Sequence, residues 1–570
     1  MCGIFLAISK KKLNKKKCVD SEALIKSRGP DITNNSFFFN KKVFLTNTIL
    51  SISGEVNDKK KLQQSKSKRH VLSFNGEVYN WRELAKIYNL IESKNDSQLL
   101  INLFDKIDTN KIPRKINGMF AYCVIDKKRK KVYFSTDVQG EKKFFLFQND
   151  NNFILSSNIN AIINYIGKDS LNIDQIKNYF NSRHFIYETD TIFNNIKVIP
   201  PGYTFCLNIE NFKLKKKIYD NPLNWISKST YLKNKKKSFS LYKFQLKEKL
   251  EKQAKLMIPD TKFGCILSGG IDSAIQTAIL RKFKKPFEIA GLNYLGKDKV
   301  SQKINEFSSF FSFNVKRLDI TKKKYLKDFK KCYKIFGSPF LTHHFVGSHQ
   351  ISKYFKKNEN KVMFGADGLD ELMGGYELYK KIKWIPGKNC SPYSLVSING
   401  KLKKKIDKTW SSAFKKYKKF LGIKEASIQA SLFTDYFIQS VYVSNIGADI
   451  MCSSNGIENR NIFIQKNVIT EFLNTPLKYK INFKSKKKKF ILKPIIKRIF
   501  TDHFPEKLIS IQKQGFSGFP NESRVFFKKN RYKHLSKIID LNSIKKSYET
   551  EWKMLNLEFF LRIFKSKIIF

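Results

Sequence analysis

Hydrophobic residues in the first 210 positions form short alternating or continuous runs, a pattern typical of β-strands. The runs are "VLSFNGEVY" (71–79), "MFAYCVID" (119–126), "KVYFSTD" (131–137), "KKFFLFQ" (142–148) and "NFILSS" (152–157). The polar "KKRK" between the second and third runs predicts a hairpin tip. Helices are expected between strands, at 81–90 and 96–106.

The hydrophobic period changes at about residue 245. "KFGCILSGG" (262–270) predicts a buried strand that runs into glycines, and Ile271, Ile275, Ile279 and Phe283 then recur every four residues, as on one face of a helix. The same alternation continues through "FEIAGLNYL", a helix near 299–311, "NVKRLDI" and "KVMFGADG". This order predicts an α/β fold with a doubly wound parallel sheet.

Between these regions, the lysine-rich and strand-poor stretch 211–240 is interpreted as a linker. Mostly helical sequence is expected beyond residue 400. A length of 570 residues fits two to four domains, and 41% hydrophobic residues with 51 phenylalanines can fill their cores.

The net charge of +61 raises the question of nucleic-acid binding. Lysine greatly outnumbers arginine and is abundant together with asparagine, isoleucine and phenylalanine, all encoded by A/T-rich codons. A biased genome explains this composition without a partner, so nucleic-acid binding is not favoured.

The eight cysteines are scattered, without a C-x-x-C pair, among only seven histidines. This distribution argues against a zinc site or a disulfide framework, and it favours a reducing environment. No apolar run has transmembrane length and no signal peptide is recognised, so we expect a cytoplasmic protein that is not membrane-bound.

The first candidate for chemistry is "MCGIF" at the N-terminus. If Met1 is removed, Cys2 carries both a thiol and a free α-amine, which is a weak base already in place. Such a nucleophile is suited to acyl transfer. The alternative is that Cys2 is an ordinary small residue.

A second candidate is "LSGGIDS" (267–273), which ends a strand and opens a helix. Gly269 and Gly270 permit close backbone approach, and the helix N-terminus with the hydroxyls of Ser268 and Ser273 offers donors to an anion. Asp272 would repel a phosphate unless it holds a bridging Mg²⁺. The segment resembles the pyrophosphate-binding loop of ATP pyrophosphatases.

An acidic motif, "GADGLDELMGGY" (365–376), follows another predicted buried strand. Asp367, Asp370 and Glu371 lie close together between glycines, so a cation is the natural partner, and a second magnesium ligand is expected here.

Together with "MCGIF", these motifs resemble the glutamine-dependent asparagine synthetase family. Further segments occur in family order: "RGPD" (28–31), "NGEVYN" (75–80), "NDSQLL" (95–100), "INGMFAY" (116–122), "GEKKFF" (140–145), "TIFNNIKVIPPG" (191–202), "GIENR" (456–460) and "IQKQGF" (511–516). The resemblance implies an N-terminal-nucleophile αββα sandwich that releases ammonia, followed by an ATP-pyrophosphatase domain that receives it internally. The implied limits are a glutamine amidotransferase domain over 2–210, a linker over 211–240, a synthetase domain over 241–545 and a tail over 546–570.

The resemblance also assigns roles in the first domain. Cys2 would attack the glutamine amide, and Asn75 with the backbone of Gly76 would form the oxyanion hole. The implied glutamine-binding set is Arg28, Leu50, Ser51, Asn75, Gly76, Glu77 and Asp96.

In the second domain, the resemblance implies Mg²⁺ on Asp272 and Asp370, acyl-adenylate formation at Asp367, and stabilisation of phosphate charge by Lys513. Glu458 and Arg460 match a structural pair. The implied ATP-binding set is Leu267, Ser268, Gly269, Gly270, Asp272, Ser273, Ala290, Gly365 and Ala366.

The chain departs from the family pattern at several positions. The family's arginine for the glutamine α-carboxylate is Ile49 here, and the proline of its "G-x-K-P" turn is Lys143. Arg28 or a lysine from a neighbouring loop is the candidate replacement for the missing cation. These departures indicate a paralogue with a changed acceptor or a weakened glutaminase.

The leading interpretation is therefore a ligase that uses glutamine and ATP to amidate an acidic acceptor, with aspartate as the first candidate. A sugar acid of a surface polysaccharide is the alternative acceptor. A tRNA-modifying pyrophosphatase would share the "SGG-x-DS" loop but leaves Cys2 unexplained, and a silent scaffold is argued against by the retained Cys2, Asn75, Asp272 and Lys513. A homodimer stays open beside a monomer.

Overall fold

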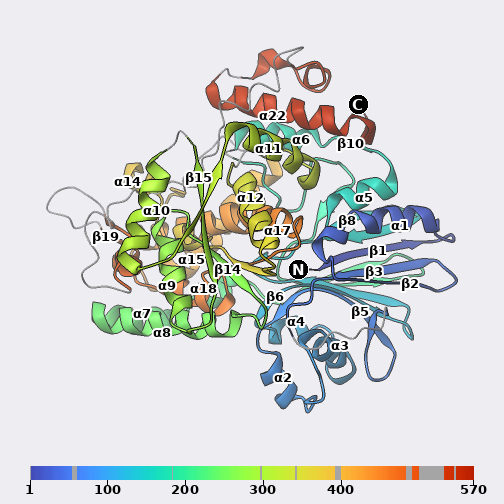
Figure 1. The fold of residues 1–570 in the computed structure, drawn as a ribbon, viewed down its shortest axis with the longest axis horizontal. Coiled ribbons are helices and arrows are strands. Elements are labelled where there is room, and N and C mark those ends of the chain that lie inside the picture. The colour runs from blue at the N-terminus through green and yellow to red at the C-terminus, as the bar shows by residue number, and fades with distance from the viewer. Residues whose placement is uncertain are drawn as a thin grey trace.

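The computed structural model describes residues 2–53, 61–182, 184–295, 298–340, 343–391, 400–482, 491–499, 532–544 and 547–569. Within these ranges the chain forms an N-terminal part built on two antiparallel sheets and a second part built on a parallel sheet (Figure 1). The expected order of the two architectures is confirmed.

The first antiparallel sheet has six strands in the order β11-β8-β9-β1-β3-β2. Its strands are β1 (Gly3–Ser9), β2 (Ile32–Phe38), β3 (Val43–Ile49), β8 (Phe145–Gln148), β9 (Asn152–Ser156) and β11 (Ile196–Val198). Helices α1 (Lys15–Ala23) and α5 (Ile159–Ile166) pack together beside this sheet, while α6 (Ile173–Asn181) and η1 (Lys26–Arg28) follow in the connections.

The second antiparallel sheet also has six strands, in the order β13-β12-β7-β6-β5-β4. Its strands are β4 (Gln63–Gln64), β5 (His70–Val78), β6 (Gly118–Asp126), β7 (Lys131–Thr136), β12 (Tyr203–Asn208) and β13 (Leu214–Ile218). Helix α3 (Asp96–Lys106) packs on β5, with α2 (Trp81–Ile87) against it and α4 (Ile112–Lys115) next in the chain.

The side chains of β1 point alternately to two faces, and this shows how the two antiparallel sheets pack face to face. Ile4 and Leu6 share a buried cluster with residues of the second sheet such as Phe134, whereas Phe5 faces the other way and contacts the ring of Tyr165 on α5. Because successive strand residues point to opposite faces, each sheet is covered by the other sheet on one side and by helices on the other. The result is the expected αββα sandwich.

The second part contains a five-stranded parallel sheet in the order β16-β15-β14-β17-β18. The strands are β14 (Phe263–Ile266), β15 (Glu288–Tyr294), β16 (Lys316–Ile320), β17 (Val362–Phe364) and β18 (Glu458–Arg460). Helices α9 (Ile271–Arg281), α10 (Asp298–Phe311), α11 (Lys322–Phe336) and α12 (His343–Lys357) alternate with the strands. The predicted doubly wound pattern is confirmed, and the loops "LSGG" and "GADG" both leave the carboxyl ends of strands.

Helices dominate the chain after β17, as expected. They are α13 (Leu369–Met373), α14 (Leu378–Lys381), α15 (Gly400–Lys418), α16 (Ile423–Asp435), α17 (Asn445–Ser453), α18 (Lys466–Leu473), α19 (Leu477–Lys480) and α20 (Pro494–Lys497). A π-helix, η3 (Tyr436–Ser444), joins α16 to α17, and a short hairpin of β19 (Ile481–Asn482) and β20 (Ile491–Leu492) precedes α20.

Two stretches differ from the sequence expectation. The stretch 211–240 is not strand-poor, because β13 pairs with β12 as an edge strand, and η2 (Pro222–Trp225) and α7 (Lys228–Lys236) follow before α8 (Phe239–Met257). The lysines of β13 interrupt the hydrophobic pattern by which a strand is predicted, although charged side chains are common on exposed sheet edges. The stretch 546–570 is not a plain tail, because it holds α22 (Tyr548–Phe564), η7 (Lys565–Lys567) and β21 (Ile568–Ile569), which pairs with β10 (Asp169–Ser170) of the N-terminal part.

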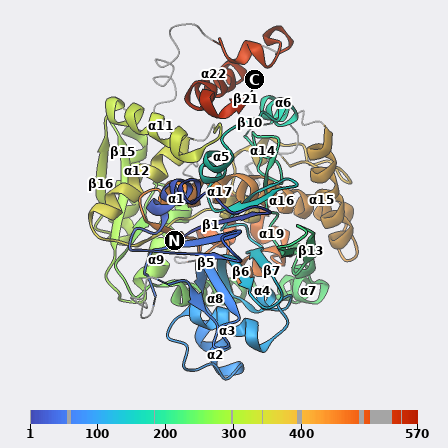
Figure 2. The ribbon, with the colours of Figure 1, turned by 90° about the vertical axis from the view of Figure 1, so that its right-hand side faces the viewer.

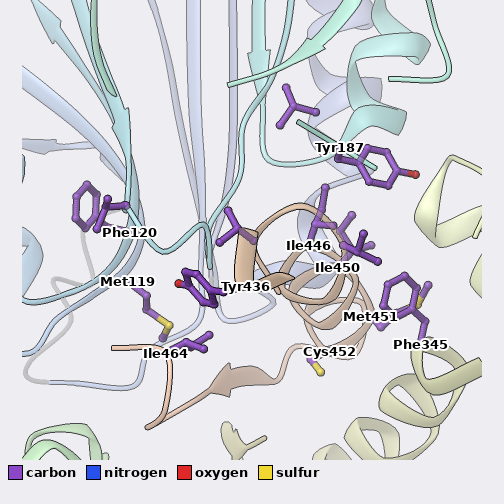
Figure 3. Close-up of a cluster of buried hydrophobic side chains, with 14 of the residues drawn as sticks. Met119, Phe120, Tyr187, Phe345, Tyr436, Ile446, Ile450, Met451, Cys452 and Ile464 are labelled. Carbon is purple, nitrogen blue, oxygen red and sulfur yellow. The ribbon is translucent and has the colours of Figure 1, made fainter. Parts of the chain in front are cut away.

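The two parts meet along η3 and α17, where Tyr442 of η3 and Asp449 of α17 bond to residues of the N-terminal part, and Figure 2 shows α17 near β1. Figure 3 shows the apolar contact between the two parts. Met119 and Phe120 of β6 lie on one side of Tyr436 and Ile464, and Ile446 and Ile450 of α17 lie on the other side. The backbone takes part too, since Tyr187 N donates to Tyr442 O at 3.1 Å. Within the described residues, helices with both the length and the apolar character of a membrane span are absent.

We predict that Gly264→Ala, in the central strand β14, lowers the stability of the chain. A Cβ there would lie 2.1 Å from the ring of the fully buried Phe355, so the packed core would have to shift. Overpacking of this kind costs about 1–3 kcal/mol. Chemical denaturation should show this loss, and the double variant Gly264→Ala/Phe355→Leu should recover part of it. Gly422→Ala is the control, because a Cβ there meets nothing within 4 Å, and equal effects of both alanines would contradict the prediction.

Candidate functional site

A pocket of about 590 Å³ opens beside Cys2 at the start of β1. Cys2 N donates to Asn75 Oδ1 at 2.9 Å, and burial raises the pKa of the Cys2 thiol. Asn75 is fully buried in β5, and its Nδ2 has no hydrogen-bond partner among the described residues. The Asn75 side chain thus holds the backbone of Cys2 and has an N–H donor without a partner among the described residues.

Gly76 is held in a conformation that only glycine adopts readily. Its φ is +145°, and a Cβ would lie 2.0 Å from the carbonyl oxygen of Met119 on the neighbouring strand β6. The chain therefore needs glycine at this position, which brings the backbone of β5 close to the pocket.

Two carboxyl groups face the same pocket. Glu77 forms an ion pair with Arg460 Nη2 at 3.0 Å, and burial raises the pKa of the Glu77 carboxyl to about 8. Asp96, at the start of α3, accepts from Val78 N at 3.0 Å, and burial raises the pKa of Asp96 to about 6. Because both groups accept hydrogen bonds, they are better suited to bind the ammonium group of a ligand than its carboxylate.

The predicted glutamine-binding residues Leu50, Ser51, Gly76, Glu77 and Asp96 line this pocket, and so does Ile49. Arg28 does not, which corrects the prediction that it binds glutamine or replaces the missing arginine. Its guanidinium donates to Asp449 Oδ2 at 2.7 Å and to Ser453 Oγ at 2.8 Å, both on α17, and its Nε donates to Cys2 O at 3.0 Å.

Among the described residues, the cations that line this pocket are lysines. They are Lys61, Lys66 and Lys68, and Lys66 pairs with Glu92 at 2.5 Å. Sequence reasoning also missed Asn34 and Asn47, because polar residues inside an otherwise ordinary strand pattern give no separate signal.

A second pocket, of about 490 Å³, lies at the carboxyl ends of β14 and β17. The loop after β14 is held by Ser273, whose Oγ accepts from Ser268 N at 3.1 Å and donates to Gly270 O at 2.8 Å. This arrangement turns the loop into the N-terminus of α9, where free N–H groups favour an anion.

Most of the predicted ATP-binding residues line this pocket: Ser268, Gly270, Asp272, Ser273, Gly365 and Ala366, together with Asp367. Leu267, Gly269 and Ala290 are not among the lining residues. Leu267 and Ala290 are fully buried, and Leu267 N donates to Ala290 O at 2.9 Å, so their side chains belong to the core beneath the pocket.

Asp272 and Asp370, predicted to hold Mg²⁺, converge on one cationic atom. Lys493 Nζ donates to Asp272 Oδ1 at 2.5 Å and to Asp370 Oδ1 at 2.6 Å. Two carboxylate oxygens facing one positive charge fit a hard divalent cation that would take its remaining ligands from phosphates and water. No group of three or more metal-ligating side chains occurs within the described parts of the chain.

Lys493 is a site residue that sequence reasoning missed. It is buried and lines the pocket, but it follows the lysine tract of 484–489 in the sequence, where one more lysine gives no signal. Lys513, the predicted phosphate-binding lysine, lies outside the described residues.

Two further acidic groups shape this pocket. Asp367 N donates to Asn461 Oδ1 at 3.1 Å, which fixes the backbone after β17. Burial raises the pKa of Glu371 to about 7, and Tyr376 donates to its Oε1 at 2.5 Å. Glu458 pairs with Arg460 at 2.8 Å and is buried, in line with the expected structural role of that pair.

Comparison with known proteins covers nearly the whole chain. Residues 1–219 match the sequence profile of a glutamine amidotransferase domain, and residues 245–567 match that of asparagine synthase.

Relatives of known name are similar at low identity. A putative asparagine synthetase [glutamine-hydrolyzing] 2 of Methanocaldococcus jannaschii is 24% identical over 316 residues, which cover 54% of this chain and 59% of the relative. Asparagine synthetase [glutamine-hydrolyzing] 1 of Bacillus subtilis is 24% identical over 406 residues (67% and 60%), and the Gallus gallus asparagine synthetase is 23% identical over 408 (67% and 68%). The match thus spans about three fifths of the length of the first two relatives.

A solved structure of glutamine phosphoribosylpyrophosphate amidotransferase from B. subtilis, complexed with ADP and GMP, aligns with 50% of this chain and 65% of its own at 12% identity and a TM-score of 0.29. Because the asparagine synthase profile alone matches more than half of the residues, the chain belongs to the asparagine synthase family, with a glutamine amidotransferase domain at its N-terminal end.

Proposed function

We propose that this protein is a ligase that transfers the amide nitrogen of glutamine to an acidic acceptor at the expense of ATP. The observation that carries the proposal is the joining of two pockets in one chain, one beside Cys2 with the unused Asn75 Nδ2 donor and one beside the Ser268–Ser273 loop. The reaction would yield glutamate, AMP, pyrophosphate and an amide.

In the first pocket, Cys2 is the nucleophile. With Met1 removed, the α-amine of Cys2 would accept the thiol proton, and the thiolate would attack the glutamine amide carbon. Asn75 Nδ2 and the N–H of Gly76 would donate to the oxyanion that forms. Ammonia leaves and water hydrolyses the thioester, which returns glutamate and the free thiol.

The α-amino group of glutamine would be received by Glu77 and Asp96, both acceptors facing the pocket. Its α-carboxylate would face Ile49 and the lysines at 61, 66 and 68. An apolar side chain cannot pair with a carboxylate, so recognition of glutamine is expected to be weak.

In the second pocket, the loop Ser268–Ser273 and the N-terminus of α9 would hold the phosphates of ATP, and Asp367 would face the forming acyl-adenylate. Asp272 and Asp370 would hold Mg²⁺, which when bound neutralises phosphate charge. Lys493 keeps both carboxylates aimed at one point, and Lys513 is proposed to contact the phosphates.

Aspartate is the proposed acceptor, so that the amide is asparagine, because similar proteins of Methanocaldococcus jannaschii and Bacillus subtilis bear the name asparagine synthetase. The departure at Ile49 supports weak use of glutamine and does not choose among acceptors. An acid of another class, such as a sugar acid, is distinguished by ATP–pyrophosphate exchange, since exchange requires the acid that is adenylated.

We predict that Cys2→Ala abolishes glutamine-dependent synthesis and spares synthesis from ammonium salts, because the second pocket does not contain Cys2. Coupled assays of asparagine and pyrophosphate would measure both activities, and mass spectrometry of the wild type should show loss of Met1. Cys206→Ala, a half-buried cysteine of β12, is the control. Loss of both activities in Cys2→Ala would contradict a two-site enzyme.

Asp272→Asn should lower aspartate-dependent ATP–pyrophosphate exchange by about 10²-fold or more, since a neutral amide is a poor partner for a cation beside phosphate. Glutaminase activity should persist. Asp174→Asn, an exposed residue of α6, is the control and should leave exchange unchanged. Exchange at the wild-type rate in Asp272→Asn would exclude this carboxylate from the adenylation site.

Ile49→Arg should lower the KM for glutamine by about tenfold or more, because a charge-assisted hydrogen bond to the α-carboxylate is worth about 1.5–3 kcal/mol. The wild type should prefer free ammonia when both nitrogen donors are supplied. Ile87→Arg, at an exposed position of α2, controls for added charge. Tight glutamine binding by the wild type, weakened by Ile49→Arg, would show that another group holds the carboxylate.

A further inference from the structure

Lys361, a residue of the second part, bonds to the wall of the Cys2 pocket. Its Nζ donates to Asp31 Oδ2 at 2.7 Å and to the carbonyl oxygen of Ser51 at 3.0 Å. Lys361 directly precedes strand β17, whereas Asp31 and Ser51 belong to the N-terminal part. One ammonium group therefore bridges the two parts through a side chain and a backbone oxygen.

The segment that Lys361 holds is residues 49–53, which form one side of the Cys2 pocket. All five of its residues line that pocket. Ile49 ends strand β3, and residues 50–53 have neither helical nor strand structure. The backbone groups of such a segment need partners outside regular secondary structure, and those partners set its shape.

Asp31 and Lys361 supply several of these partners. Asp31 N donates to Ile49 O at 3.1 Å, and Ser51 N donates to Asp31 Oδ2 at 2.9 Å. Lys361 bonds to the same carboxylate oxygen and to Ser51 O. Ser51 is thus held at both its N–H and its carbonyl group, and each of these bonds involves a charged partner, which makes it stronger than a neutral one.

The ion pair behind these bonds is partly shielded from water. The side chains of Lys361 and Asp31 are 29% and 27% exposed. Burial raises the pKa of Asp31, but the hydrogen bonds from Lys361 and from Ser51 N outweigh it, so the pKa of Asp31 lies below its ordinary value. A partly buried pair is screened by salt less than an exposed one, so the bond to Ser51 keeps a charged partner.

The neighbouring strand of the second part supports the same pocket. Strand β18 pairs with β17, and Glu458 N donates to Lys361 O at 2.8 Å. Arg460, two residues further along β18, forms an ion pair with Glu77 at 3.0 Å. Two adjacent strands therefore reach the Cys2 pocket, one at residues 49–53 and the other at Glu77.

Ile49 offers no charge to a carboxylate, so glutamine recognition depends on the shape of the pocket wall and on its remaining polar groups. Lys361 is not among the described residues that line the pocket, and it acts on that wall through Asp31 and Ser51. Resting on the proposed function above, we propose that Lys361 is a positioning residue that holds residues 49–53 in the conformation that binds glutamine.

The test measures glutamine hydrolysis by the full-length enzyme. Lys361→Met keeps an unbranched side chain but removes its charge, so Ser51 loses one bond and Asp31 loses its cation. The KM for glutamine should rise by about threefold or more while kcat stays within about twofold, because Cys2 and the β5 backbone are unchanged. Lys361→Arg keeps the charge and should return KM to within about twofold of the wild type. Asp31→Ala breaks the same link from the other side and should also raise KM.

ATP–pyrophosphate exchange on the same variants detects a general disturbance of β17. Gly365, Ala366 and Asp367 follow this strand and line the Asp272 pocket. Because Lys361 precedes the strand at its other end, exchange with aspartate should stay within about twofold of the wild type in Lys361→Met.

Lys262→Met is the matched control. Lys262 O accepts from Lys361 N, but the Lys262 side chain pairs with the exposed Glu359, so the KM for glutamine should not change. Circular dichroism melting checks that each variant folds.

The outcomes separate the positioning role from the proposed function. An unchanged KM for glutamine in folded Lys361→Met would overturn the positioning role. A parallel loss of glutaminase and exchange that Lys361→Arg does not restore would also overturn it, and would show that Lys361 only supports β17. A wild type that forms no glutamate from glutamine would overturn the proposed function, and the positioning role with it.

Discussion

The structure depends on a buried ion pair that crosses between its two parts. Arg28, the last residue of η1, meets Asp449 on α17 at 2.7 Å, and both side chains are at least 95% buried. Lys142 joins the same carboxylate, and the resulting charge pulls the pKa of Asp449 below its usual range despite burial. Removing one member of such a pair leaves an uncompensated buried charge, which typically costs about 3–5 kcal/mol.

This pair reaches further than stability, because Arg28 also holds the carbonyl oxygen of Cys2. The position of the candidate nucleophile is thereby tied to a helix of the other part. A second ionic link runs parallel to it, from Glu77 in the Cys2 pocket to Arg460 on β18. The elements α17 and β18 thus hold residues around Cys2, and they also line the Asp272 pocket through Ala448 and Asn459. A displacement of either element would therefore move residues at both pockets.

The π-helix η3 occupies the same junction. Gln439 and Ser444 of this segment line the Asp272 pocket, while Tyr442 accepts a backbone hydrogen bond from Tyr187 of the N-terminal part. π-helical turns are rare and are frequent at functional sites, because the wider turn redirects the side chains that follow. Here the π-helical segment lies in one continuous helical run from α16 to α17. The same segment lines the Asp272 pocket and contacts the N-terminal part.

Local sequence determined the type and order of the elements. The period-two runs gave the strands of the sandwich, the four-residue spacing after "LSGG" gave α9, and glycines next to acids marked both loops of the Asp272 pocket. Motif order also indicated that Cys2, just before β1, belongs with Asn75, Gly76 and Glu77 of β5. Cys2, Gly76 and Glu77 do line one pocket, and Asn75 bonds the backbone of Cys2. Each of these features depends on residues that are near one another in the sequence, so a local pattern predicts it.

Only the tertiary structure decided the partners of the buried charges. Arg28 was expected at the glutamine pocket, but Asp449, more than 400 positions away, takes its guanidinium, and no local pattern links the two. Lys493 follows a lysine tract and gives no separate signal in the sequence, but the fold buries it between Asp272 and Asp370. The sequence by itself therefore determined which elements form and where their chemistry gathers, whereas folding decided which charges meet, because a buried charge is stabilised only by whatever partner the packed chain brings within reach.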